Sequence, residues 1–312
     1  MNFKSVSISD REILTSYFFK YGESSCQYSF AAMLGLKEKY GDEYFIEDDI
    51  LYIHRSNRDY ENYRVYLAPL CPKKSNIKAA VNRIVDDAHS HGCLASFETV
   101  TGHFLNSLQS AFDENEKKVT LNDTNFSVIE DRDYAEYIYS TEKMSILPGR
   151  ALAAKRNRVR AFYSAYDGHI KIENITHSNI DDVIALQKKW IEARRKEGID
   201  EMLETENIAI HTYFENYKTL GFSGIIVYVY GTPVGYAAGV PLSESTFDEV
   251  IEKGLPEITG IYQLLCNEFA LICCKDYKYL NREEDIGIEG LRRAKLSYEP
   301  EILLSKYVMR EN

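Results

Sequence analysis

A run of cations is notable because its residue types could bind phosphate. Residues 148–166, PGRALAAKRNRVRAFYSAY, are rich in arginine and lysine and contain no acidic residue. Good helix formers after Pro-Gly predict a helix, on which Lys155 and Arg158 share one side and Arg156 lies on an adjacent side. Guanidinium and ammonium groups in this arrangement bind phosphate, and Asn157 between them can orient a ligand. The alternative is a solvated face whose charges pair with acids elsewhere.

A carboxylate on a second predicted helix could serve as a general base. Counting 100° per residue from Ile261, Glu268 falls on the apolar face with Leu264 and Leu265. Burial raises the pKa of a carboxylate that has no cation beside it, and a raised pKa suits proton transfer near neutral pH. The alternative is a structural ion pair with an arginine.

The third candidate region is the charged segment at residues 281–295, NREEDIGIEGLRRAK, which predicts a loop that leads into a short helix. Gly287 and Gly290 allow positive φ or a close approach to a ligand, although turn glycines in a polar loop are the alternative. Asp285 and Glu289 can cap a helix or bind an amine. The cations of interest here are Arg282, Arg292 and Lys295.

These regions need a scaffold, and the second half of the chain predicts one. After Gly168 the expected order is helix, helix, strand, strand, helix, strand, helix and strand. Apolar stripes mark the helices, and β-branched or aromatic runs mark the strands at residues 223–230 and 234–240. A final strand is expected at residues 302–309. The first half mixes helical and strand patterns, and residues 121–139 show no clear period, so we expect them to be extended or irregular.

Length, charge and cysteine usage limit the function. The 312 residues suggest two domains, and 37 Lys+Arg against 48 Asp+Glu give a formal net charge of −11, which excludes a generally basic nucleic-acid coat. The six cysteines form no Cys-x-x-Cys pair and, like His89, His91 and His103, lack the spacing of a metal site, so no metal is expected. The chain shows neither a signal peptide nor a long apolar run, which predicts a cytoplasmic protein.

Three segments together resemble a known family. They are residues 137–144 (YIYSTEKM), residues 147–158 with their Leu-Pro-Gly-Arg and Lys-Arg-Asn-Arg sequences, and residues 281–300. These segments, and Asn-Glu-Phe-Ala at residues 267–270, are similar to the C-terminal domain of phosphatidylglycerol lysyltransferases. The resemblance spans nearly the whole chain, and its last segment is the most specific part.

The resemblance implies a mixed α/β or α+β fold built from two tandem acyltransferase-type domains of the GCN5-related N-acetyltransferase (GNAT) class. Each domain would hold a central, mostly antiparallel sheet flanked by helices, in agreement with the order of elements predicted for the second half. We expect domains at residues 1–146 and 147–312, with the basic helix at about 147–166 opening the second. Two halves of similar size could also be a diverged duplication.

The resemblance further implies direct group transfer, because lysyltransferases of this family move an aminoacyl group from aminoacyl-tRNA to a lipid hydroxyl. In this fold adjacent strands splay, backbone N–H groups polarise the donor carbonyl, and a carboxylate or water removes a proton from the acceptor. The strand expected beside the carbonyl comprises Tyr236, Ala237, Ala238, Gly239 and Val240. The candidate bases are Glu268, Glu289 and Asp285. The expected ligands of donor phosphate are Lys155, Arg156, Asn157, Arg158, Arg282, Arg292 and Lys295.

Donor and acceptor stay open at this level. The donor would be aminoacyl-tRNA, which makes tRNA a partner, or acyl-CoA, and the acceptor would be a small-molecule or aminoacyl amine or hydroxyl. Residues 257–263 lack the glycine-rich loop that holds coenzyme A in this fold, so no cofactor is assigned. The long run of membrane helices of the lysyltransferases is missing here, so no integral membrane contact is expected, although residues 150–160 could touch anionic lipid. A non-catalytic binding or regulatory protein on the same scaffold is the alternative function.

Overall fold

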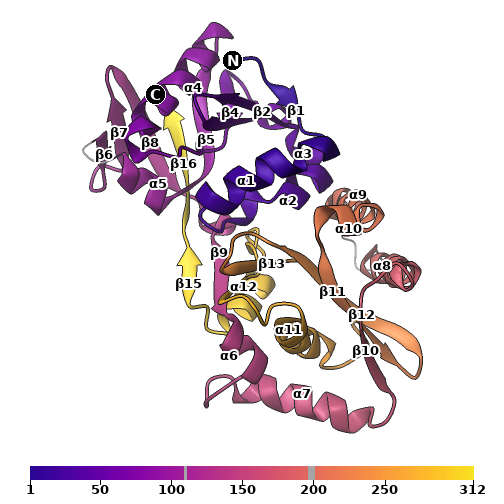
Figure 1. The fold of residues 1–312 in the computed structure, drawn as a ribbon. Helices are drawn as coiled ribbons and strands as arrows, with labels where there is room; N and C mark the ends of the chain where they lie inside the picture. Colours follow the sequence, from indigo (N-terminus) through magenta and orange to yellow (C-terminus); the bar gives the residue numbers. More distant parts are fainter. Residues whose placement is uncertain (109–110, 196–200) are drawn as a thin grey trace. The chain divides into compact units, whose positions relative to one another are not determined.

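The computed structural model describes residues 1–108, 111–195 and 201–312 (Figure 1). The chain divides into two compact units. Unit 1 comprises Met1–Glu136, Glu284–Ile288 and Leu303–Asn312, and unit 2 comprises Tyr137–Glu283 and Glu289–Ile302. The expected boundary at residue 146 therefore needs correction, because unit 2 begins earlier and the chain returns to unit 1 twice.

Unit 1 is built on a mixed sheet with strand order β1-β2-β3-β4-β5-β16-β8-β7-β6. Its helices are α1 (Arg11–Tyr21), α2 (Phe30–Gly35), α3 (Lys37–Tyr40), α4 (Ile77–Ser90) and α5 (Gly102–Ser107). Its strands are β1 (Lys4–Ser5), β2 (Asp42–Glu47), β3 (Ile50–Arg55), β4 (Tyr63–Tyr66), β5 (Leu94–Thr101), β6 (Phe112–Asp113), β7 (Lys118–Leu121), β8 (Thr124–Glu130) and β16 (Lys306–Glu311). The apolar side of α4, with Val81 and Ile84, joins Phe97 and Phe126 in the core of this unit.

Unit 2 contains the sheet β10-β11-β12-β13-β14-β9-β15. Its strands are β9 (Glu136–Ser140), β10 (Ile170–Asn174), β11 (Ser223–Val229), β12 (Thr232–Pro241), β13 (Thr246–Gly254), β14 (Tyr279–Asn281) and β15 (Ile302–Leu304). Its helices are α6 (Thr141–Ile146), α7 (Ala153–Ala165), α8 (Ile180–Arg195), α9 (Glu201–Glu215), α10 (Tyr217–Leu220), α11 (Ile261–Ile272) and α12 (Glu289–Leu296). Leu264, Leu265 and Phe269 of α11 pack with Val227 of β11 and Ala237 of β12 in its core.

The predicted helices and strands of the second half are largely confirmed, but the strand β10 and the short helix α10 were not expected, and two further corrections are needed. The meander after α10 has a third strand, β13, in a segment to which the sequence analysis assigned no element. The last strand, expected at residues 302–309, is divided: β15 pairs in the sheet of unit 2, and β16 lies between β5 and β8 in the sheet of unit 1, antiparallel to both. Because β16 pairs with a strand on each side, its backbone N–H and C=O groups form hydrogen bonds along both edges. A strand at the edge of the sheet of unit 2 would form them along one edge only.

The two units repeat one order of elements. In unit 1, β2, β3 and β4 form an antiparallel meander, and α4 crosses over to β5, which pairs with β4 in parallel. In unit 2, β11, β12 and β13 form the meander, and α11 crosses over to β14, which pairs with β13 in parallel. Ligands of open sheets usually bind at the carboxyl ends of such parallel strands. Each unit therefore has one corner where a site is expected.

Candidate functional site

In unit 2 this corner lies where β13 extends beyond the end of its parallel neighbour, β14. β14 pairs with β13 only from Thr246 to Asp248, opposite Tyr279 to Asn281. β13 then continues to Gly254, paired with β12. The chain after β14 begins with Arg282, whose side chain therefore lies beside the second half of β13.

A bulge in the β12–β13 pair lets two glutamates of β13 reach this corner. Side chains three residues apart on a regular strand point to opposite faces. The register shifts between Ala238 and Val240, so that Glu249 and Glu252 flank an extra residue on β13 and both contact Arg282. Gly239 makes the shift feasible, because a Cβ at this position would lie 1.7 Å from the carbonyl oxygen of Asp248.

Replacing Gly239 should therefore disrupt the site. We expect Gly239→Ala to lower the free energy of unfolding by about 2 to 3 kcal/mol, because backbone rather than a flexible side chain occupies the space. Chemical denaturation measures this loss. Gly290→Ala is the matched control, since a Cβ there meets no atom within 4 Å, and it should stay within about 0.5 kcal/mol of the wild type. Equal effects of the two substitutions would contradict the assigned role of the bulge.

The centre of the site is a buried ionic cluster. The Nε atom of Arg282 donates to Oε2 of Glu249, and its Nη2 atom donates to Oε2 of Glu252. The guanidinium also lies over the rings of Tyr139 and Tyr298, at 5.9 and 5.6 Å from their centroids. With 11% of the Arg282 side chain and 1% of the Glu249 side chain exposed, these charges act in a medium of low polarity.

Glu249 has the electrostatic properties of a proton acceptor near neutral pH. Burial and the adjacent carboxylate of Glu252 raise the pKa of Glu249 to about 8, although Arg282 acts in the opposite direction. Its Oε1 atom is buried and receives no hydrogen bond from the described residues. A proton bound there lies next to Glu252, so the two carboxylates together can hold or release one proton close to pH 8.

Two further side chains close the cluster on the side of α7 and α11. Cys266 of α11 donates its thiol to Oε2 of Glu252 at 3.2 Å, and burial raises the pKa of this thiol well above its usual range. A neutral thiol is a poor nucleophile, so covalent catalysis through Cys266 is disfavoured. Lys155 of α7 lies 4.4 Å from the ring centroid of Tyr298, and burial lowers the pKa of its ammonium group.

The predicted phosphate ligands divide into those near the cluster and those on the surface. Arg282 and Lys155 belong to the cluster, and Lys295 joins them by donating to the carbonyl oxygen of Arg282 at 2.6 Å. Arg156 donates to the carbonyls of Leu147 and Gly149 and so caps the end of α6. Asn157 and Arg158 are exposed on α7, and Arg292 is half-buried on α12.

The basic helix is confirmed as α7, and its charges are not paired with acids. Across the described ranges, none of the cations from Arg150 to Arg160 forms an ion pair with a carboxylate. In a chain with a formal net charge of −11 this is unusual, because carboxylates are plentiful. The pairing with acids that the alternative interpretation expects is therefore not found among the described residues, although Arg158 and Arg160 are exposed to solvent.

The three predicted general bases lie on different elements and have different partners. Glu268 is half-buried on α11 and accepts a hydrogen bond from Tyr163 of α7 at 2.7 Å. It follows Cys266 by two residues, which turns it to the other side of the helix. Glu289 is exposed at the start of α12. Asp285 is buried in unit 1, where it pairs with Arg132 and accepts from the backbone of Gly287.

The strand predicted to polarise a donor carbonyl is β12. It is the neighbour of β13, the strand that diverges from β14. Tyr236, Ala237, Ala238 and Val240 are buried in β12, between β11 and β13. An interior strand uses its backbone N–H groups in the sheet, and the hydroxyl of Tyr236 donates to Gln187 at 2.7 Å. The divergence lies between β13 and β14 instead, one strand further along.

Sequence reasoning missed Glu249 and Glu252 because it missed β13. The strand sequence TFDEVIEKG alternates poorly, since its buried positions include Asp248, Glu249 and Lys253. A pattern search treats such acids as loop residues.

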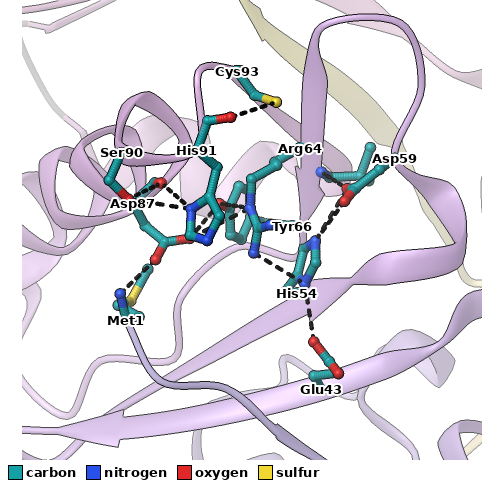
Figure 2. Close-up of polar contacts among 11 residues, drawn as sticks. Met1, Glu43, His54, Asp59, Arg64, Tyr66, Asp87, Ser90, His91 and Cys93 are labelled. Carbon is teal, nitrogen blue, oxygen red and sulfur yellow. Dashed lines mark hydrogen bonds and ion pairs between the residues drawn. The ribbon is translucent and has the colours of Figure 1, made fainter.

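Unit 1 holds a second polar network, around His54 (Figure 2). His54 lies between the carboxylates of Glu43, at 3.3 Å, and Asp59, at 2.9 Å. Tyr66 donates to Asp87 at 2.7 Å, and the amino group of Met1 also donates to Asp87. Figure 2 also labels Arg64, Ser90, His91 and Cys93. These bonds join β2, β3, β4 and α4, so the network stabilises the sheet of unit 1.

The comparisons with known proteins agree with this arrangement. The family model described as "Phosphatidylglycerol lysyltransferase, C-terminal" matches residues 18–310. The chain belongs to this family. Membership confirms the resemblance and the expected tandem acyltransferase-type fold, since the matching solved structures share it over nearly the full length.

Several solved structures are similar to this family member. A conserved protein of unknown function from Bacteroides thetaiotaomicron superposes with a TM-score of 0.89 and 28% identity, over 100% of both chains. L-PGS from Bacillus licheniformis reaches a TM-score of 0.63 at 12% identity, over 96% of this chain and 91% of that one. FemX reaches 0.58 at 9% identity, over 98% and 97%. The last two identities show the fold alone.

A curated relative matches a smaller share of the chain. An uncharacterised protein of Mycoplasmoides gallisepticum is 23% identical over 178 residues, which are 56% of this chain and 55% of that protein. The match therefore spans about half the length of this curated relative. In the part of the chain that the structure describes, no helix combines the length and the apolar character needed to cross a bilayer.

Proposed function

We propose that this protein transfers an aminoacyl group from aminoacyl-tRNA to an amine or hydroxyl acceptor. Membership of the lysyltransferase family supports aminoacyl transfer as the general chemistry. The observation that carries the proposal is the buried pair Glu249 and Glu252 with Arg282, at the corner where β13 and β14 diverge. Such a pair can take a proton from an acceptor at a pH where amines and hydroxyls need activation.

The transfer balances without a covalent enzyme intermediate. The acceptor oxygen or nitrogen attacks the ester carbonyl, the bond from that carbonyl to the ribose oxygen breaks, and a new ester or amide forms. Glu249 in its ionised form receives the proton of the acceptor and passes the same proton to the departing ribose oxygen, so that Glu249 is ionised again after the transfer. The edge of β13 that β14 has left offers backbone N–H groups for the developing negative oxygen.

The exposed face of α7 suits the RNA part of the donor. Arg158 and Arg160 are exposed there and form no ion pair within the described residues. Phosphates neutralised by such side chains release counterions, so binding should weaken steeply with salt. This concentration of cations stands out in a chain whose formal net charge is −11.

We expect Arg158→Ser with Arg160→Ser to weaken binding of aminoacyl-tRNA by about tenfold and to reduce its salt slope by about 1 to 2. Filter binding across a salt series measures both quantities. Lys188→Ser with Lys189→Ser, two exposed cations on α8, is the control with the same change of charge. If both double variants lose the same affinity, the contact is only general electrostatics and α7 is not the RNA site.

A transfer assay decides between the proposal and its alternatives. The protein is supplied with tRNA charged with radiolabelled amino acids and with amine and hydroxyl acceptors, and in parallel with labelled acetyl-CoA. We expect labelled ester or amide only from aminoacyl-tRNA. Turnover of acetyl-CoA alone would replace the proposal with acetyl transfer. Tight binding of aminoacyl-tRNA without turnover would favour a non-catalytic binding protein.

A further inference from the structure

The corner of unit 1 that corresponds to the ionic cluster of unit 2 contains a cavity. Its volume is about 250 Å³, and it lies at the carboxyl ends of the parallel strands β4 and β5. The segment 68–72 that follows β4 forms one wall, and Thr101 at the end of β5 with residues of α5 forms another. The functional chemistry assigned above uses none of these residues.

The inner wall of the cavity is apolar. Tyr28, Leu70, Ile77 and Phe104 line it and are all buried. The hydroxyl of Tyr28 donates to the carbonyl oxygen of Ala68, so this polar atom is already satisfied within the protein. The volume corresponds to roughly eight water molecules, which is room for a short hydrocarbon chain rather than for a large group.

The rim of the cavity carries an excess of positive charge. Lys20 and Lys74 line it, and within the described residues neither ammonium group has a hydrogen bond or an ion pair. The single acid of the rim, Glu23, already accepts the hydroxyl of Thr101 at 2.5 Å and lies 4.0 Å from His103. α4 also begins at Ile77, so the positive end of its dipole lies at the cavity.

We propose that unit 1 binds a small carboxylate with an apolar body, such as a medium-chain fatty acid. The hydrocarbon part occupies the wall formed by Leu70, Ile77 and Phe104, and the carboxylate lies at the rim between Lys20 and Lys74. The carboxylate meets the two lysines and the hydrocarbon chain meets the apolar wall. An amine would meet Glu23 as the acid of the rim, and Glu23 already accepts a hydrogen bond from Thr101. The inference does not rest on aminoacyl transfer, because the cavity lies wholly within unit 1.

Isothermal titration calorimetry of the full-length protein with octanoate tests the proposal. We expect one octanoate per chain. Lys20→Gln with Lys74→Gln should weaken the binding of octanoate by about fivefold and leave the binding of 1-octanol unchanged, because only the carboxylate meets the lysines. Lys78→Gln with Lys117→Gln removes the same charge from unit 1 outside the lining and should change the affinity for neither ligand.

A second pair of variants tests the location. Cys71 is half-buried in the lining, and burial raises the pKa of its thiol to about 12, so it is neutral and replaceable by an apolar group. Cys71→Phe fills the cavity and should lower the affinity for octanoate at least about tenfold. Cys93→Phe changes a half-buried cysteine outside the lining and should leave this affinity unchanged. Absence of octanoate binding, tighter binding of octylamine than of octanoate, or equal effects of the two cysteine variants would each overturn the proposal. None of these measurements uses a tRNA donor, so failure of the transfer assay leaves the result unaffected.

Discussion

Glu249→Gln is expected to reduce the rate of aminoacyl transfer at least about 100-fold, the usual contribution of a positioned general base. Glutamine keeps the shape of the side chain and resembles its protonated form, so Arg282 can keep a hydrogen bond to it. The wild-type rate should rise with pH and level off above about pH 8, where Glu249 becomes ionised. This inflection should be missing from the variant. Single-turnover transfer assays from pH 6 to 9 measure both effects.

Glu244→Gln is the matched control, since Glu244 is exposed in the turn before β13 and the structure assigns it no role. It should keep the wild-type rate and pH profile. Glu268→Gln tests the base predicted from sequence. If Glu268→Gln abolishes transfer while Glu249→Gln does not, the base is on α11 and the assignment made here is wrong.

Glu249→Gln also changes the free energy of unfolding, and the sign of this change follows from the raised pKa of Glu249. The folded protein raises the pKa of Glu249 from its ordinary value of 4.5 to about 8. The folded state therefore binds the proton more tightly, so this stabilisation is full below about pH 4 and is lost as the pH rises to 8. Glu249→Gln removes the titration. Between pH 5 and 8 the variant should gain stability relative to the wild type, by up to about 4 kcal/mol.

Arg282→Met is expected to lower the free energy of unfolding by about 3 to 5 kcal/mol at pH 8, because it leaves two glutamates in a buried site without their cation. Methionine fills a similar volume, so the loss reports charge rather than a cavity. The loss should be smaller at pH 5, where Glu249 is protonated in both proteins. Chemical denaturation at the two pH values measures the difference.

Two further variants make this prediction sharper. Arg83→Met removes an exposed ion pair, in which the Nε atom of Arg83 lies 2.9 Å from Glu47, and should cost less than about 1 kcal/mol. Arg282→Met combined with Glu249→Leu and Glu252→Leu should recover most of the stability, since no buried charge remains. A pH-independent loss in Arg282→Met, or no recovery in the triple variant, would show that the cluster is not held by charge.

Much of the scaffold follows from sequence pattern. Apolar residues at helical spacing predicted α8 and α11, and the acid-free run predicted the basic helix α7. The β-branched runs on either side of the Gly-Thr-Pro turn predicted β11 and β12. Local periodicity suffices for these elements because each buries one apolar face. The exceptions are β13, whose buried acids conceal its alternation, and β16, whose partners are more than 170 residues away in the chain.

By itself, the sequence determined the family, the two-unit organisation and the concentration of positive charge on α7. It also named Lys155, Arg282 and Lys295 among the expected ligands of donor phosphate, a role that stays a prediction, and the structure places these three around Tyr298 and the carbonyl of Arg282. Only the tertiary structure decided which carboxylates join them. Burial and partners fix the charge state of a glutamate, and both depend on residues distant in the chain. Glu249 meets Arg282 because of a bulge at Gly239 and because β14 ends at Asn281, and neither feature has a local pattern.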